Sequence, residues 1–198
     1  MARSTNTSGR STDAPRDAIA LLKQDHRTVS QLFEEFEKAD DEEQSAIAQR
    51  VCQLLTVHAQ IEEEILYPEA KEAFGGEEES EDLVNEAEVE HGSAKELIAK
   101  IEAMSSDDEH FKATVTVLGE YIKHHVKEEE GELFPQLKKT DLDLKEIGSR
   151  LADRKFALMD QLGIEDQEPA QPRKRAAASR GGSRSKSSRA RSGSRARH

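Results

Sequence analysis

The chain has 198 residues, the length of one domain, of which 34% are hydrophobic and 35% are charged. The apolar share is too small for a large α/β core, but it is enough for amphipathic helices that each bury one face. The longest apolar run, residues 18–22, is too short to span a bilayer, and residues 1–17 lack the apolar stretch of a secretory signal. The single cysteine, Cys52, excludes an internal disulfide framework and a zinc site built on several thiolates. These features predict a soluble cytoplasmic protein.

The net charge of −12 combines two segments of opposite charge. Residues 1–168 contain all 41 acidic residues, whereas residues 169–198 contain ten Lys or Arg and no acidic residue. This division is typical of a folded acidic domain followed by a basic tail. We expect residues 1–13 and the Arg/Ser-rich residues 173–198 to be disordered, and residues 164–172 to form a linker.

The apolar spacing of residues 14–163 is helical almost throughout, and no stretch alternates as a strand would. Glycines and acidic residues at the breaks mark helix ends and starts. The predicted helices cover residues 14–39, 40–74, 80–104, 107–139 and 142–162. Because the connections are short, consecutive helices should pack antiparallel. The sequence therefore predicts an all-α fold, an up-and-down four-helix bundle with an additional C-terminal helix.

Each of the first four helices carries an apolar stripe with steps of three and four residues, the spacing of a face that points into a bundle. In every stripe one histidine takes the place of an apolar residue, and in the second and fourth helices a glutamate follows one turn later. The six polar residues are His26, His58, Glu62, His91, His125 and Glu129.

These six residues need a common explanation, although one histidine on an apolar face is usually a hydrogen-bonded core residue. A buried carboxylate is costly without a compensating positive charge, and no Lys or Arg lies on the four stripes. A metal ion supplies that charge, and a histidine and a glutamate at positions i and i+4 of a helix can reach the same ion. The pattern predicts a site for two metal ions with carboxylates free to bridge them.

An internal repeat supports this interpretation. Residues 57–68, VHAQIEEEILYP, align with residues 124–135, HHVKEEEGELFP, at an offset of 67. Tyr67 and Phe134 occupy equivalent positions, and we expect both to pack at the end of the core beside the prolines that follow them. His124 is one residue off the stripe and is expected to face solvent. The chain looks like a duplicated helix pair.

The whole pattern over residues 17–162 resembles the hemerythrin-like (HHE cation-binding) domain family. Its members are four-helix bundles, and the resemblance implies two non-haem iron ions joined by an oxo or hydroxo bridge. It also implies that the four histidines are terminal ligands and that Glu62 and Glu129 are bridging carboxylates. Glu130 is an alternative bridging ligand, because oxygen-carrying hemerythrins use HxxxxD on the fourth helix and Glu130 lies five residues after His125.

One position departs from the oxygen-carrying hemerythrins. These have HxxxH on the third helix, whereas Ala87 stands four residues before His91. The loss leaves two histidines for each metal and disfavours reversible oxygen carriage. The resemblance then implies a protein that acts on or senses dioxygen, peroxide or a related small oxidant, as an enzyme or as a sensor. The alternative is an iron-binding or storage module without catalysis.

Two further alternatives stay open. Zinc or manganese would also accept these ligands. A ferritin-like carboxylate site fits less well, because the chain has one Glu-x-x-His, from Glu88 to His91, where that fold needs two.

The basic residues 173–198 suggest a partner. Ten positive charges separated mainly by small and polar residues would bind nucleic acid through its phosphates, without reading the bases. Alternatively the tail contacts an acidic surface, such as its own bundle, or has no partner. A combined hypothesis is that the tail tethers an iron- or peroxide-handling bundle near DNA.

Overall fold

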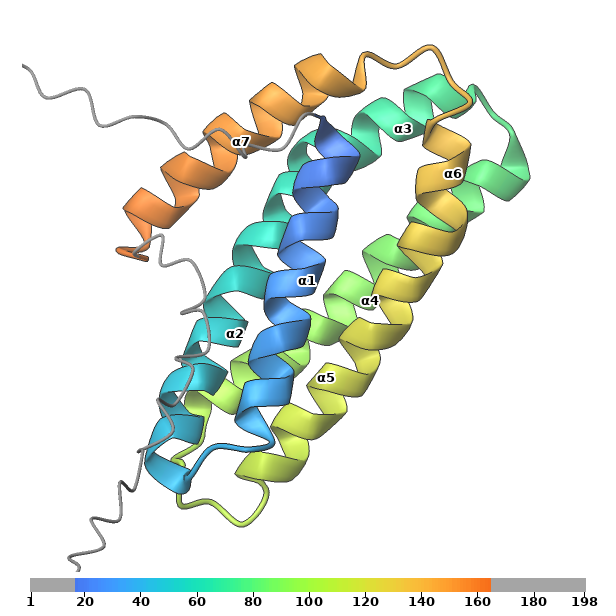
Figure 1. Ribbon diagram of the computed structural model, residues 1–198. Helices are drawn as coiled ribbons and strands as arrows, with labels where there is room; N and C mark the ends of the chain where they lie inside the picture. The colour runs from blue at the N-terminus through green and yellow to red at the C-terminus, as the bar shows by residue number, and fades with distance from the viewer. Residues whose placement is uncertain (1–16, 165–198) are drawn as a thin grey trace, which may run out of the picture. The chain divides into compact units, whose positions relative to one another are not determined.

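The computed structural model describes residues 17–164, which form an up-and-down bundle of antiparallel helices with a further helix lying across one end (Figure 1). The elements are α1 (Ala18–Phe36), α2 (Asp41–Ile61), η1 (Glu62–Leu66), α3 (Tyr67–Phe74), α4 (Glu78–Ala103), α5 (Phe111–Glu128), η2 (Glu129–Leu133), α6 (Phe134–Leu137) and α7 (Leu144–Gln161). The predicted fold class is confirmed: the described residues contain no strand. The predicted N-terminal segment 1–13 and tail 173–198 lie outside the described residues, as does the predicted linker 164–172 apart from Ile164.

Acidic side chains cap the N-termini of three of these helices by accepting hydrogen bonds from free amide groups of the first turn. Asp17 accepts from the amide of Ala20 at 2.8 Å, and Asp40 and Asp143 cap α2 and α7 in the same way. The backbone of Asp17 is extended, so α1 begins at Ala18. Asp17 is thus the capping residue of α1, and the predicted helix start at residue 14 lies outside the described residues.

Two π-helical turns interrupt what the sequence predicts as continuous second and fourth helices. The η1 and η2 segments begin at Glu62 and Glu129, and the amides of Tyr67 and Phe134 donate to the carbonyls of these two glutamates, five residues back. The next residue in each case is a proline, which has no amide to donate to the carbonyl four residues before it. π-Helix is rare, occurs mostly as single turns inside α-helices, and is frequent at functional sites.

The core consists of two hydrophobic clusters. One lies toward the α7 end of the bundle and includes Leu22, Leu66 and Leu133. The other lies toward the opposite end and includes Val29 and Leu118. The six polar residues fall between these two clusters along each helix, so the bundle contains a polar layer enclosed by apolar side chains on both sides.

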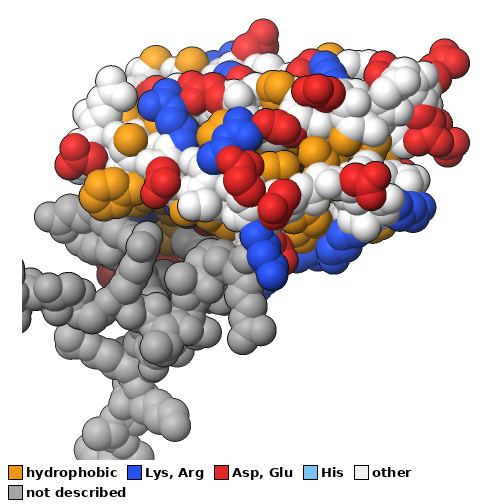
Figure 2. Space-filling view, turned by 90° about the horizontal axis from the view of Figure 1, so that it is seen from above, with side chains coloured by type: hydrophobic (Ala, Val, Ile, Leu, Met, Phe, Trp, Pro, Cys, Tyr) orange, Lys and Arg blue, Asp and Glu red, His pale blue; other side chains and the backbone are white. Residues whose placement is uncertain are grey.

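Helix α7 packs across α1 and α2 with a mixture of apolar and ionic contacts. Its apolar face buries Ile147 and Leu151, and Arg150 and Arg154 form ion pairs with Glu69 of α3 and Glu64 of η1. Seen from this end, acidic and basic side chains lie next to one another, with hydrophobic side chains between them (Figure 2). Over residues 17–164, no helix has both the length and the hydropathy that crossing a bilayer requires.

Candidate metal centre

The structure brings all six polar residues of the stripes together in the middle of the bundle. Each of the four bundle segments contributes one histidine, and the two glutamates are the first residues of the π-turns. All six side chains are buried, and Glu62 is fully inaccessible to solvent. The residues at the centre are His26, His58, Glu62, His91, His125 and Glu129.

The histidines form two pairs with facing ring nitrogens. The Nε2 atoms of His26 and His58 lie 3.2 Å apart, and those of His91 and His125 lie 3.3 Å apart. Imidazole nitrogens bind a divalent ion such as Zn²⁺ at about 2.0–2.1 Å. Two such ligands separated by an angle of about 100° would be about 3.2 Å from one another. The spacing within each pair thus fits two nitrogens on one ion.

The carboxylate of Glu62 lies between the two histidine pairs. Its Oε2 atom is 3.1 Å from Nε2 of His58 in one pair and 3.5 Å from Nε2 of His91 in the other. Ligand atoms of His26, His58, Glu62 and Glu129 all lie within 4.8 Å of one another, and so do those of Glu62, His91 and His125. Glu62 therefore belongs to both groups.

Glu129 has the equivalent position. Its Oε2 atom is 3.2 Å from Nε2 of His26 and 3.6 Å from Nε2 of His125, again one histidine from each pair. Both carboxylates are thus placed to contact two ions at once.

The carboxylate oxygens provide an independent test of whether a metal fits here. Among the described residues, both oxygens of Glu62 and the Oε2 atom of Glu129 are buried and accept no hydrogen bond. Buried polar atoms in folded proteins nearly always have a partner, because an unpaired one costs free energy. A cation bound between the glutamates would satisfy these oxygens, so the residues fit a metal centre.

An acidic side chain lies beside the outer nitrogen, Nδ1, of each of the four central histidines. Such outer partners fix the ring orientation and raise the basicity of a ligating histidine. The four contacts are His26 with Glu130 at 3.0 Å, His91 with Glu63 at 3.0 Å, His125 with Glu90 at 2.8 Å, and His58 with Asp25 at 3.7 Å. Sequence reasoning named Glu130 in another role, as an alternative bridging ligand, and missed the other three acids, although each of the four directly adjoins one of the six central residues in the chain.

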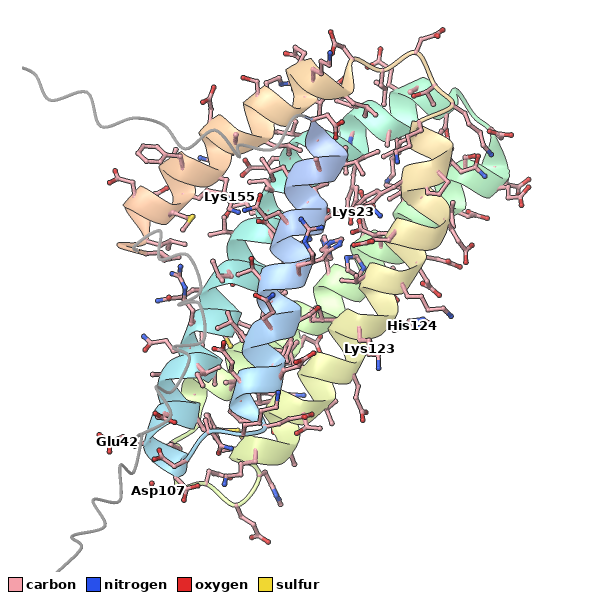
Figure 3. The ribbon with its side chains drawn as sticks, in the orientation of Figure 1. Lys23, Glu42, Asp107, Lys123, His124 and Lys155 are labelled. Carbon is pink, nitrogen blue, oxygen red and sulfur yellow. The ribbon has the colours of Figure 1, made fainter. Side chains whose placement is uncertain are left out.

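Glu130, the alternative bridging ligand, is not among the grouped central residues. One of its oxygens contacts Nδ1 of His26 and the other accepts a hydrogen bond from Lys23 at 2.7 Å. Lys23, labelled in Figure 3, thus joins α1 to η2, which contains Glu130. Burial opposes the ionisation of Glu130, but its contacts with Lys23 and His26 lower its pKa overall. This position favours Glu129 over Glu130 as a bridging residue.

Tyr67 reaches the centre, which sequence reasoning also missed. Its hydroxyl donates a hydrogen bond to Oε1 of Glu129 at 2.9 Å and lies 3.4 Å from Nε2 of His91. Phe134, the equivalent residue of the second repeat, instead stacks on the ring of His26. Both rings are buried as predicted, but they contact the polar layer as well as the core. In the sequence, the only indication of this role is the hydroxyl that distinguishes Tyr67 from Phe134.

Other candidate residues lie away from the centre. Ala87 is buried at the position where oxygen-carrying hemerythrins have a further histidine, and the neighbouring Glu88 forms an exposed ion pair with Lys71. His124 faces solvent, as expected, on the outer side of α5 (Figure 3). Among the described residues, no further His, Cys, Asp or Glu joins the group of Glu62, His91 and His125, and the Tyr67 hydroxyl lies 3.4 Å from Nε2 of His91.

Burial is the largest single influence on the pKa values at the centre, although neighbouring charges can outweigh it. It raises the pKa of Glu62 well above its usual range, and the charge of Glu129 adds to the effect. Burial acts on Glu129 in the same direction, but His125 and His26 outweigh it and lower its pKa to about 2. Burial and the neighbouring His125 lower the pKa of His91 to about 3, which keeps this ring neutral, the form that binds metals.

A small apolar cavity adjoins the histidines on the side away from α7. Its walls include Val29, Leu55, Ile98 and Ile122 together with the central histidines, and its volume is about 20 Å³. A space of about 10–15 Å³ on this measure holds one water molecule. The cavity therefore has room for a molecule of one or two heavy atoms next to the centre.

Comparisons with known proteins agree with this geometry. Residues 17–137 match the model of the hemerythrin HHE cation binding domain. A hemerythrin HHE cation binding domain-containing protein from Mycobacterium kansasii has a similar crystal structure, with a TM-score of 0.62 and 23% identity; the match covers 73% of this chain and 88% of that one.

A curated relative is a DNA nickase from Nostoc sp. (strain PCC 7120), 31% identical over 119 residues. The match covers 60% of this chain but only 32% of that protein. The family model covers more than half of the present chain and includes all six central residues. Domains of this family bind metal cations, and the chain belongs to the hemerythrin HHE cation-binding family.

Proposed function

We propose that the protein holds two non-haem iron ions and acts on or senses a small oxidant, dioxygen or peroxide. The observation that carries this proposal is the position of Glu62 and Glu129. One oxygen of each glutamate lies near two histidines, one from each pair. Two carboxylates shared in this way fit two adjacent ions better than one.

The donor set supports iron. Two imidazoles and a carboxylate with open positions are typical of non-haem iron sites that react with oxygen, although zinc and manganese accept similar donors. When bound, the iron ions supply redox chemistry and open coordination positions. The four histidines hold them through Nε2, and the outer acids keep these rings oriented and basic. The small apolar cavity beside the rings would admit a diatomic oxidant and exclude larger substrates.

Metal analysis of the purified chain tests the proposal directly. We expect about two irons per chain, and fewer in His58→Ala and Glu129→Gln, because each variant removes a donor from the centre. His110→Ala is the matched control, since this exposed histidine lies just before α5 and outside the grouped residues. Two zinc ions and no iron would contradict the redox function. No metal after anaerobic loading with ferrous iron would contradict the metal centre itself.

Peroxide consumption separates an oxidant-handling protein from an iron store. Disproportionation of hydrogen peroxide to oxygen and water needs no other reductant, so oxygen release can be followed with the iron-loaded chain alone. Turnover that is lost in His58→Ala and kept in His110→Ala would support an enzyme. Two bound irons that react with neither peroxide nor dioxygen would favour the storage module.

We infer a second function, non-specific binding to nucleic acid, from the composition of residues 173–198. These contain ten Lys or Arg and no acid, and the partial relative from Nostoc is a DNA nickase. Binding through phosphates weakens steeply as salt is raised. We expect the full chain to bind duplex DNA at low salt, and a chain ending at residue 172 to lose this binding. Equal binding by both chains would contradict a role of the tail.

A further inference from the structure

Helix α7 provides a contact to the centre from outside the bundle. The match to the family ends at residue 137, so α7 is an addition to the four-helix unit. Its Lys155 contacts Oδ1 of Asp25 through a short charged hydrogen bond. The other oxygen of Asp25 lies 3.7 Å from Nδ1 of His58. Figure 3 shows Lys155 between α7 and the bundle. The three residues thus form a chain from α7 to the centre.

The other outer acids contact basic side chains on the bundle helices themselves. Glu130 contacts Lys23, and Glu63 contacts Lys95 at 2.6 Å. Glu90, the equivalent of Asp25 in the second half, lies 3.7 Å from His124, whose side chain is 58% exposed. Only the Asp25–His58 contact therefore depends on a helix beyond the four-helix unit, within residues 17–164.

Asp25 and His58 face one another without a hydrogen bond between them. Asp25 is buried, and its Oδ2 atom and the Nδ1 atom of His58 have no hydrogen-bond partner among the described residues. The other three histidines have outer contacts of 2.8–3.0 Å. Asp25 thus contacts Lys155 through one oxygen and faces His58 with the other.

The docking of α7 fixes Lys155 in place. Arg154, the preceding residue, forms a two-pronged contact with Glu64 at 2.6 and 2.9 Å. Gly148 lies so close to α1 that an added Cβ would be 2.5 Å from the amide nitrogen of Ala18. These contacts leave α7 little freedom to slide, so Lys155 stays opposite Asp25.

We propose that Lys155 is a positioning residue that orients His58 through Asp25, so that α7 makes the two metal positions unequal. This inference rests on the proposed function in one respect, that His58 is a metal ligand. The position built on His26 and His58 then depends on α7, whereas the position built on His91 and His125 does not.

Imidazole nitrogen NMR of the metal-free full chain tests the orientation without any metal. In Lys155→Met, which keeps most of the aliphatic stem, we expect the ring-nitrogen shifts of His58 to change and those of His125 to stay. Lys155→Arg should restore the His58 signals, because it returns a charged donor. Lys95→Met is the matched control and should move His91 instead of His58. Unchanged His58 signals in Lys155→Met, or equal changes at all four histidines, would overturn the proposal.

Stepwise titration with ferrous iron under anaerobic conditions tests the consequence for metal binding. Loss of an outer partner of a ligating histidine typically lowers metal affinity about 10–100-fold. We expect Lys155→Met to weaken one of the two binding steps about 10-fold, and Lys155→Arg to restore it. Lys95→Met should weaken the other step. Equal weakening of both steps by Lys155→Met would overturn the inequality.

The two experiments separate this inference from the proposed function. If the wild-type chain binds no iron but the NMR signals respond as expected, the metal centre is wrong and the orientation of His58 by Lys155 stands. If the chain binds two irons and Lys155→Met changes neither the His58 signals nor either binding step, the metal centre stands and the positioning role is wrong.

Discussion

The hydroxyl of Tyr67 donates a 2.9 Å hydrogen bond to Oε1 of Glu129, whereas Phe134, at the equivalent position of the second repeat, has no hydroxyl to donate to Glu62. The two glutamates, at equivalent positions of the repeat, therefore differ in their hydrogen-bond partners. Glu129 has a protein donor, and both oxygens of Glu62 have none among the described residues. Burial and the charge of Glu129 raise the pKa of Tyr67 well above its usual value, so the phenol remains a donor throughout the physiological range.

Replacing Tyr67 with Phe should destabilise the metal-free protein. The substitution removes the donor and leaves Oε1 of Glu129 buried and unpaired, which costs about 1–3 kcal/mol. Urea denaturation of the metal-free chain measures this loss. Tyr121→Phe, at the half-buried second tyrosine, is the control and should change stability by less than about 0.5 kcal/mol. Equal stability of Tyr67→Phe and the wild type would show that the hydrogen bond contributes nothing.

The Arg154–Glu64 pair should make the docking of α7 sensitive to acid. The hydrogen bonds from Arg154, with help from Gln60, lower the pKa of Glu64 from 4.5 to about 2. A carboxyl whose pKa is lower in the folded state stabilises it above the unfolded pKa, and this contribution disappears as the pH falls through the folded pKa. The contribution is therefore complete above pH 4.5 and is lost between pH 4.5 and about 2.

Thermal unfolding of Glu64→Gln and the wild type across this range checks the sign. We expect the variant to be less stable at neutral pH and the difference to vanish toward pH 2. In an Arg154→Met background the same substitution should have a much smaller effect, because the cationic partner is gone. A difference that grows as the pH falls would contradict the assignment.

The thiol of Cys52 should be unreactive in the folded protein. Burial, and to a lesser degree the charge of Glu102, raises its pKa to about 12, and the side chain is almost inaccessible. Because the thiolate is the reactive form, labelling with a thiol reagent at pH 8 should be slow and limited by unfolding. In guanidinium chloride the chain should react with one equivalent, since it has a single cysteine. Fast labelling under native conditions would place Cys52 in an exposed position.

Two glycines on helices should respond to alanine with opposite sign. A Cβ at Gly148 would meet the backbone of Asp17 and Ala18 at 2.5–3.0 Å, so Gly148→Ala should displace α7 and cost about 1–3 kcal/mol. A Cβ at Gly92 of α4 would meet nothing within 4 Å, so Gly92→Ala should stabilise by about 0.5–1 kcal/mol through helix propensity alone. Urea denaturation of both variants checks the pair, and equal effects would contradict the close approach of α7.

Periodicity in the sequence was enough to predict the four bundle helices and the six residues that meet at the centre. Each of these residues interrupts an apolar stripe, and in a bundle all stripes face the same interior. Their role as metal ligands remains a prediction that the metal analysis will decide. The family assignment, made from the same spacing, is confirmed by the match over residues 17–137.

Features that depend on contacts between side chains of different helices could not be predicted from periodicity. The outer acids look like ordinary surface carboxylates in the sequence, and only the packing shows that Asp25 and Glu90 adjoin histidines of other helices. The fifth helix was predicted, but its own stripe does not say which bundle helices it covers. Tyr67 was expected in the core because an aromatic side chain buries well, and its hydroxyl gave no direction by itself.

The π-turns at Glu62 and Glu129 bear on where the chain can change length. Each residue of an α-helix advances the side-chain direction by about 100°. A π-turn closes its hydrogen bond over five residues instead of four, so its extra residue is absorbed by looser winding and the helix after it keeps its direction. In the regular helix between a histidine and its glutamate nothing absorbs such a change, and one residue added or removed would rotate the glutamate by about 100° away from the centre. Insertions and deletions should therefore be tolerated in the connections near residues 75–77 and 104–110, but not between His58 and Glu62 or between His125 and Glu129.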